Sequence, residues 1–303
     1  MAGQQELIMT RQTKEKIIKY ILFLFSLVSV LVLALIVFSL FREGLPIFKK
    51  ISLRDFLLGM EWYPTSDPPL FGIFPLIFGS FIVTLISTLI AVPLGVLSAI
   101  YIAEIAPVSI KEILKSLIEL LAGIPSVVLG FFGMIVVAPW LQETFDLPTG
   151  LNIINASVIL AIMAIPTISS ISEDALYAVS REFKEASYAL GATKFETITR
   201  IIVPSALSGI STAVILGMSR AIGETMVVLM VAGGAAAIPE SLFDSVRPMP
   251  ASIAAEMGEA PYRGWHYQAL FATGIVLFAL TLIFNLIADY VSHKFRQSGS
   301  ATL

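Results

Sequence analysis

The stretch EASYALGATKFETITRIIVP, Glu185 to Pro204, is the most informative part of the chain. It belongs to a polar loop at about residues 172–207 that separates two apolar runs. Gly191 is suited to the left-handed residue that ends a helix, so we predict one short helix before it and a second from about Lys194 that Pro204 interrupts. Residue chemistry alone leaves open that the loop is an amphipathic segment lying on a membrane.

Outside this loop the chain is strongly apolar. Of its 303 residues, 57% are hydrophobic and 14% are charged, whereas soluble domains average about half and a quarter. A helix needs roughly 20 apolar residues to cross a hydrocarbon core of about 30 Å. Six runs have about this length or more: 20–41, 73–102, 115–140, 153–171, 208–233 and 268–291. The sequence therefore predicts an all-α integral membrane protein with six transmembrane helices.

The first run resembles a secretory signal because basic residues precede it, but it exceeds the usual 7 to about 15 apolar residues. We read it as a span, and assign 1–72 to an N-terminal cytoplasmic tail, this span and an outer loop. Residues 42–72 are expected to form an interfacial helix followed by a loop. Residues 73–291 form a core of five spans around the loop at 172–207, and 292–303 form a cytoplasmic tail.

An even number of spans puts both termini on one side of the membrane. If that side is the cytoplasm, the inner segments hold twelve Lys and Arg and the outer segments hold six. The positive-inside rule therefore predicts cytoplasmic termini. Trp62, Trp140 and Trp265 fall beside predicted outer span ends, where indole rings favour the headgroup level. Glu104 and Glu119, near inner span ends, are expected to reach headgroup water.

The fifth predicted span combines a packing stripe with two charges. Small residues, a common device for close helix packing in membranes, recur there at every fourth position: Gly209, Ala213, Gly217, Ala221 and Thr225. Arg220 and Glu224 stand near the middle of the span and share a face, one helical turn apart. A charge at mid-span costs roughly 2.5–3.5 kcal/mol on insertion scales, so such residues normally face a bundle interior or an aqueous route.

Two interpretations of this pair remain open on chemistry alone. In the first, Glu224 neutralises Arg220 in a structural ion pair. In the second, Arg220 offers a planar, permanently charged fork to an oxyanion in transit, and Glu224 positions it and limits how tightly the anion binds. Pro125 and Pro166, inside apolar runs, each remove a backbone donor and are expected to kink or interrupt a helix.

Several classes of function are excluded or disfavoured. A net charge of −3 gives no general attraction to nucleic acid. The chain has no cysteine, and therefore no disulfide, thiolate metal site or thiol nucleophile. It contains neither a GxxxxGK[ST] phosphate loop nor an HExxH metal motif. We expect no catalytic site, metal or cofactor in this chain, and if transport uses ATP, another chain must bind it.

The loop resembles the EAA loop of ABC importer permeases. The family has a third Ala where this chain has Ser187, and Leu where it has Val203. The resemblance implies the type I ABC importer permease fold, with a coupling helix that docks in a groove of an ATPase subunit and transmits its closure to the membrane helices. The residues that carry the motif and would serve the ATPase contact are Glu185, Ala186, Ser187, Gly191 and Pro204.

Other segments resemble the phosphate-specific branch of these permeases, in particular its C-type subunit. They are RAIGETMVVLMVAGG at 220–234, LAGIPSVVLGFFG at 121–133, AIPTISSIS at 164–172 and SIAAEMGEA at 252–260. The resemblance implies that Arg220 and Glu224 are a charged pair needed for passage of inorganic phosphate. The implied partners are a second, A-type permease subunit, two ATP-binding subunits and an external phosphate-binding protein, assembled in the lipid of the plasma (inner) membrane.

Three alternatives stay open. The EAA loop does not identify cargo, so sulfate or molybdate would suit the same machine. An ion-coupled secondary transporter would use Glu224 as a titrating carboxylate. A membrane enzyme ranks last, because the chain lacks an assembled nucleophile or metal constellation.

Overall fold

The computed structural model describes residues 2–299, and the side-chain surroundings of residues 15–291. Within this part, six helical segments are long and apolar enough to cross a membrane: Glu15–Lys49, Phe74–Ile105, Ser126–Phe145, Ile153–Tyr177, Lys194–Ile222 and Trp265–Val291. The predicted all-α membrane protein with six spans is therefore confirmed. The domain boundaries stay a prediction, and residues 300–303 of the predicted C-terminal tail lie outside the described residues.

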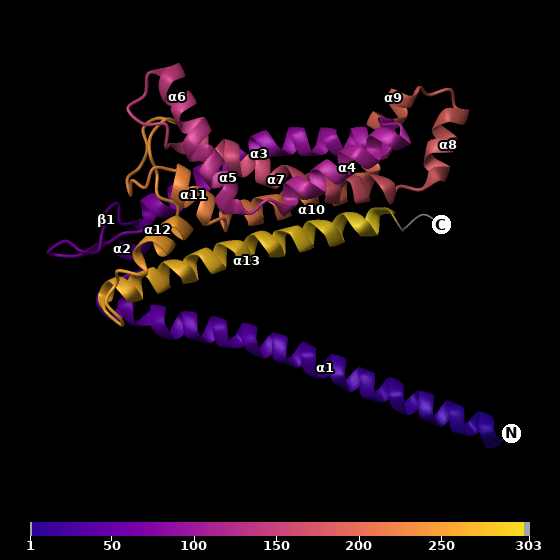
Figure 1. Cartoon of the computed structure of the whole chain (residues 1–303), viewed down its shortest axis with the longest axis horizontal. Coiled ribbons are helices and arrows are strands. Elements are labelled where there is room, and N and C mark those ends of the chain that lie inside the picture. Colours follow the sequence, from indigo (N-terminus) through magenta and orange to yellow (C-terminus); the bar gives the residue numbers. More distant parts are fainter. Residues whose placement is uncertain (1, 300–303) are drawn as a thin grey trace.

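Three helices form the centre of the bundle (Figure 1): α3 (Phe74–Ile100), α7 (Ile153–Tyr177) and α10 (Val203–Ile222). Small residues let them approach closely. A Cβ atom placed on Gly95 of α3 or on Gly217 of α10 would lie 2.9 Å or 2.7 Å from side-chain carbons of Ile168 on α7. Gly209 packs against Ala175 of α7 in the same way. The stripe from Gly209 to Ala221 is thus a helix-packing surface, as the sequence predicts, whereas Thr225, its predicted fifth member, lies past the end of α10.

Two further long helices flank this centre. α13 (Trp265–Gly299) packs along α10. α1 (Ala2–Gly44) touches α13 near Gly44 and lies farther from the bundle toward its N-terminal end (Figure 1). The beginning of α1 and the end of α13 point toward the end of the molecule that carries α8 (Arg181–Ala189), here called the α8 end. This placement agrees with an even number of crossings. The opposite end carries a short hairpin and is called the hairpin end.

The helix that contains Pro204 continues through it, so the prediction that Pro204 interrupts this helix was wrong. Residues Lys194–Ile222 form one rod, in which the π-helical turn Ile198–Ile202 directly precedes the proline. Proline lacks an N–H and its ring clashes with the carbonyl four residues earlier. The extra residue of a π turn removes that clash. The same arrangement occurs at Gly133–Val137, ahead of Pro139.

The third predicted span, 115–140, consists of separate helices rather than one. α4 (Val108–Gly123) ends where Ile124 and Pro125 adopt extended conformations, with ψ of 127° and 137°. Proline disfavours the helical conformation of the residue before it, which explains the break. The crossing continues through α5 (Ser126–Phe132) and ends in α6 (Ala138–Phe145).

The fifth predicted span, 208–233, is also broken. α10 ends at Ile222, and α11 (Met226–Val231) begins after a short non-helical stretch. The side chain of Glu224 accepts hydrogen bonds from the backbone N–H groups of Met226 (3.2 Å) and Val227 (3.4 Å). A side chain that caps a new helix in this way competes with continuation of the old one.

The hairpin end is more structured than the predicted interfacial helix and loop. It contains η1 (Leu45–Lys49), α2 (Leu53–Leu58) and the antiparallel strands β1 (Trp62–Tyr63) and β2 (Leu70–Phe71). These elements pack on α12 (Met249–Glu256) and α13. Trp62 is only 2% exposed, so its indole packs against protein at this end instead of facing headgroups, whereas Trp140 and Trp265 are exposed.

Candidate functional site

The loop at the α8 end forms the predicted helix pair. α8 is followed by Gly191, whose φ of +84° is the predicted left-handed conformation, and by α9 (Lys194–Thr197). Thr193 caps α9, and its side chain and that of Glu196 accept each other's backbone N–H groups. The backbone and side-chain hydrogen bonds from Thr193 lower the pKa of the Glu196 carboxyl below its usual value of 4.5.

The candidate coupling residues divide into two groups. Glu185, Ala186 and Gly191 lie on the surface, and a Cβ atom on Gly191 would meet no atom within 4 Å. Ser187 is buried instead and joins the two helices, because its Oγ lies 2.9 Å from Thr197 Oγ1. Pro204 belongs to the rod beyond the loop. The structure therefore brings three of the five predicted residues together on one exposed turn.

The same loop exposes large apolar side chains that the sequence reading passed over. Leu190 is 90% exposed and Phe195 is 74% exposed, and Phe183 and Tyr188 are also exposed. Apolar surface concentrated on one polar loop is typical of a protein contact. The amphipathic spacing of REFKEASYAL was the available signal for it.

A partly buried ion pair fixes α8 to the bundle. Lys184 Nζ on α8 lies 2.6 Å from Glu104 Oε1, and the two side chains are 21% and 10% exposed. Glu104 belongs to the π-helical turn Tyr101–Ile105 that extends α3. The expectation that Glu104 reaches headgroup water was wrong, because its carboxylate is paired within the chain. A second pair, Lys115 and Glu173, joins α4 to α7 at 3.6 Å.

Arg220 and Glu224 line the same narrow cavity, but each has its own partner. Arg220 Nη1 donates a hydrogen bond to Thr167 Oγ1 on α7 at 3.0 Å, while Glu224 caps α11. Among the described residues no ion pair joins these two charges. Leu160 and Met163 complete the cavity wall, and the volume is about 10 Å³, room for one water at most. Arg220 is also exposed at the surface of the chain.

Hydroxyl groups surround this charged pair, which the sequence did not reveal. A second narrow cavity lies beyond Glu224 and is lined by Ser80 and Thr84 of α3 and by Pro248 and Pro250 near α12. The Ser80 hydroxyl accepts a hydrogen bond from the backbone N–H of Met249 at 2.8 Å. The Ser80 and Thr84 hydroxyls donate to the backbone carbonyls of Leu76 (2.9 Å) and Ser80 (2.7 Å), so Thr167 is the hydroxyl that contacts Arg220 directly.

A polar network at the hairpin end was also missed. The carboxylate of Glu256 accepts hydrogen bonds from Trp62 Nε1 (3.0 Å), Arg247 Nη1 (2.6 Å) and Ser252 Oγ (3.0 Å). His266 Nε2 lies 2.7 Å from the same group. Trp62 and Glu256 are 194 residues apart, so no local pattern indicates the contact. The network joins β1, α12 and α13.

Six spans, an exposed helix pair between the fourth and fifth of them, and a charged pair within the bundle define the permease subunit of an ABC-type importer. The chain belongs to the family of binding-protein-dependent transport system inner membrane components, whose profile matches residues 91–297. The predicted family is therefore confirmed.

Curated relatives refine this placement. The chain is 42% identical over 244 residues to the probable ABC transporter permease protein YqgH of Bacillus subtilis, covering 80% of this chain and 79% of that one. It is 36% identical over 256 residues to the phosphate transport system permease protein PstC of Mesorhizobium japonicum, covering 78% and 77%. Among solved structures, a bacterial alginate ABC transporter matches with a TM-score of 0.64 at 16% identity, over 91% and 94%. That last likeness shows the fold alone.

Proposed function

We propose that this chain is the C-type permease subunit of an ATP-driven importer of inorganic phosphate, and that Arg220 contacts the anion in transit. The observation that carries the proposal is the position of Arg220 beside Thr167 and Glu224, within a crossing and at an exposed surface. An intramembrane guanidinium does not face lipid, so it faces an aqueous route or another subunit. Relatives named as phosphate permeases support this cargo.

The chemistry around Arg220 suits passage rather than tight binding. The guanidinium is permanently charged and can bind two oxygens of one phosphate. The Thr167 hydroxyl beside Arg220 can supply a further hydrogen bond, whereas the Ser80 and Thr84 hydroxyls donate to backbone carbonyls here. The carboxylate of Glu224 beside the same cavity repels the anion and so limits its residence time. Because both cavities are too narrow for phosphate here, passage requires the helices or subunits to separate.

Energy would come from separate ATP-binding subunits that dock on the α8 loop. Glu185, Ala186 and Gly191 would lie in that contact, and the exposed Leu190 and Phe195 would fill an apolar groove of the ATPase. The α8 end would then be cytoplasmic, as would both termini. A second, A-type permease subunit and an external phosphate-binding protein would complete the importer in the plasma (inner) membrane.

The alternatives receive less support. The PstC relatives favour phosphate over sulfate or molybdate. Membership of the ABC permease family disfavours an ion-coupled carrier.

Uptake of labelled phosphate into vesicles that contain the assembled importer tests the proposal. Arg220→Ala should reduce uptake about thirty- to a hundred-and-fiftyfold, because a charged hydrogen-bond partner contributes roughly 2–3 kcal/mol. ATP hydrolysis and co-purification of the subunits should persist. Arg220→Lys should restore only part of the uptake, since it keeps the charge and loses the fork.

The matched control is Arg200→Ala, an exposed arginine on the rod at the α8 end that should leave phosphate uptake near wild type. Intact uptake in Arg220→Ala would overturn the role of Arg220. Efficient competition by sulfate but not by phosphate would overturn the assignment of phosphate as the cargo.

A further inference from the structure

The junction between α4 and α5 carries a carboxylate that the proposed phosphate route does not use. Glu119 lies one turn before the break at Ile124–Pro125 and is exposed. It has no hydrogen-bond or ion-pair partner among the residues that the structure describes. That Glu119 reaches headgroup water stays a prediction, and the depth of the break itself follows from the helix packed beside α5.

The depth of the junction follows from its neighbours. A Cβ atom on Gly130, the fifth of the seven residues of α5, would lie 2.8 Å from Met230 Sδ and 3.5 Å from Val227 Cα in α11. Both segments run toward the hairpin end, so the residues just before Gly130 lie level with those just before Val227. The α4–α5 junction is therefore at about the depth of the break near Glu224, and Figure 1 shows it between the two ends of the bundle.

The backbone at this junction cannot face lipid. The last turn of any helix leaves carbonyl groups without intrahelical partners, and here the chain continues through two extended residues, Ile124 and Pro125. Non-helical backbone at membrane depth is tolerated only where protein buries it or water lines it. The free carbonyl oxygens also give the end of α4 a partial negative charge.

A hollow of about 600 Å³ lies beside the junction. Its lining residues are Ser116, Glu119, Leu120, Gly123, Ile124 and Pro125. A Cβ atom on Gly123 would meet no atom within 4 Å, so the space is open to a side chain from outside the chain. The carboxylate and the carbonyl oxygens make this hollow electronegative. It therefore repels phosphate and attracts a cation.

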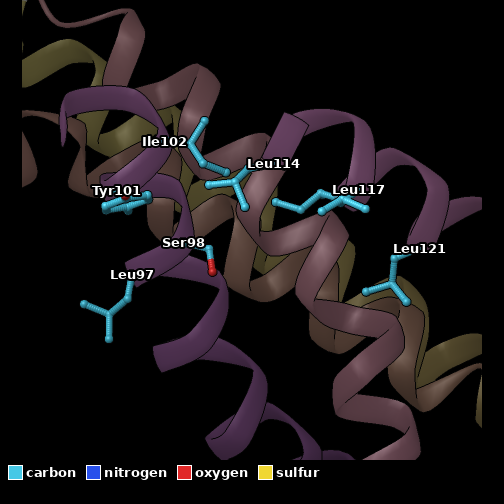
Figure 2. A pocket seen from close by; sticks show the side chains of 8 residues that line it. Leu97, Ser98, Tyr101, Ile102, Leu114, Leu117 and Leu121 are labelled. Carbon is cyan, nitrogen blue, oxygen red and sulfur yellow. The ribbon is translucent and has the colours of Figure 1, made fainter. Parts of the chain in front are cut away.

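The groove between α4 and α3 is different in character. Figure 2 shows Leu114, Leu117 and Leu121 of α4 along a groove of about 510 Å³, shared with Leu97 of α3 and with Tyr101 of the π-helical turn that extends α3. Ser98 also lines this groove, but its hydroxyl already donates a hydrogen bond to the carbonyl oxygen of Leu94. That groove suits acyl chains, whereas the Glu119 hollow does not.

We propose that the Glu119 hollow is where a second membrane-spanning subunit packs, with a basic side chain of that subunit facing Glu119. A cation there neutralises the carboxylate, and its N–H groups satisfy the carbonyl oxygens of the α4 terminus. Lipid offers neither at this depth. The inference rests on the proposed function only in that an importer supplies such a second permease subunit.

The absence of cysteine from this sequence makes the test direct, because one introduced cysteine is the sole thiol of the chain. Glu119→Cys and Gly123→Cys probe the hollow, and Leu117→Cys, in the α3–α4 groove, is the matched control. Each variant is labelled in membranes with a charged, water-soluble thiol reagent and with an uncharged, lipid-soluble one. The labelling compares the chain expressed alone with the chain in the complete importer.

We expect labelling at positions 119 and 123 to fall at least tenfold in the importer with both reagents, while Leu117→Cys keeps its reaction with the lipid-soluble reagent. Rapid reaction of 119 and 123 with the charged reagent in the importer would show a water-filled hollow, and reaction with only the lipid-soluble reagent would show a lipid-facing one. Either result overturns the proposal.

Charge variants provide a second measurement. Glu119→Lys should abolish co-purification of the second permease subunit, and Glu119→Gln should weaken it several-fold. Normal co-purification of the second subunit with Glu119→Lys would overturn the proposal that a basic side chain of that subunit faces Glu119. These readouts do not depend on transport, and Arg220→Ala should not change them. A wrong cargo assignment would therefore leave the protection of positions 119 and 123 intact, so the two failures are distinguishable.

Discussion

The two ends of the bundle are held together in different ways. At the hairpin end, the carboxylate of Glu256 gathers Trp62, Arg247, Ser252 and His266 into one network. At the α8 end, single ion pairs such as that of Lys184 with Glu104 connect the helices. A shared, satisfied network resists local opening more than isolated pairs do. The hairpin end is thus built as a fixed cap, and the α8 end as the part that can shift.

The largest expected effect comes from breaking the cap. Glu256→Ala leaves Arg247, 32% exposed, and the indole of Trp62 without their acceptor. Leaving a partly buried hydrogen-bonding group without its partner costs roughly 1–3 kcal/mol. We expect a large loss of thermal stability of the purified protein in detergent. Tryptophan fluorescence measures it, because the indole of Trp62 becomes exposed on unfolding.

Glu259→Ala is the control for this variant, since Glu259 is exposed in the same region and should change stability by less than about 0.5 kcal/mol. If Glu256→Ala melts within a degree or two of the wild type, the network does not hold the hairpin end.

The spans and the coupling loop could be predicted from the sequence because both leave local signals. Long apolar runs mark crossings, and Gly191 marks a helix end. The breaks were harder, since a hydrophobic run of membrane length passes unchanged through Ile124–Pro125. At the fifth span, Glu224 looked like a helical residue one turn from Arg220, but its side chain caps the next helix.

The partners of the charged residues could not be predicted. Lys184 and Glu104 are 80 residues apart, and Trp62 and Glu256 are 194 apart. Such contacts depend on how helices pack, and no periodicity within one helix encodes them. Thr167, the partner of Arg220, was missed for the same reason, because it lies on α7 rather than on α10.

The next effect concerns the turn after α8. Gly191 has φ of +84°, and a side chain there is strained by roughly 1–2 kcal/mol although no atom obstructs it. Gly191→Leu should abolish co-purification with the ATPase while the spans stay folded. Gly191→Asn also adds a side chain, but asparagine tolerates the left-handed conformation. If docking needs the empty space at Gly191, both variants should fail to bind the ATPase. If docking needs only the left-handed conformation, Gly191→Leu alone should fail.

Breaking the α8 tether should have a milder effect. Lys184→Met or Glu104→Gln removes the partly buried pair, which contributes about 1 kcal/mol, so transport per ATP should fall about three- to tenfold without loss of assembly. The exchange of both residues, Lys184→Glu with Glu104→Lys, should recover much of the loss. Full transport in both single variants would show that α8 is held by packing alone.

The smallest effect is a pH dependence at α9. The hydrogen bonds from Thr193 lower the pKa of Glu196 below 4.5, so its contribution to local order is complete above that value and is lost as the pH falls through the lowered pKa. Amide hydrogen exchange in Lys194–Thr197 should therefore show unchanged protection between pH 5 and 8, and reduced protection only in stronger acid. Glu196→Gln should remove this acid transition. A transition near neutral pH would instead show that another titratable group controls the order of α9.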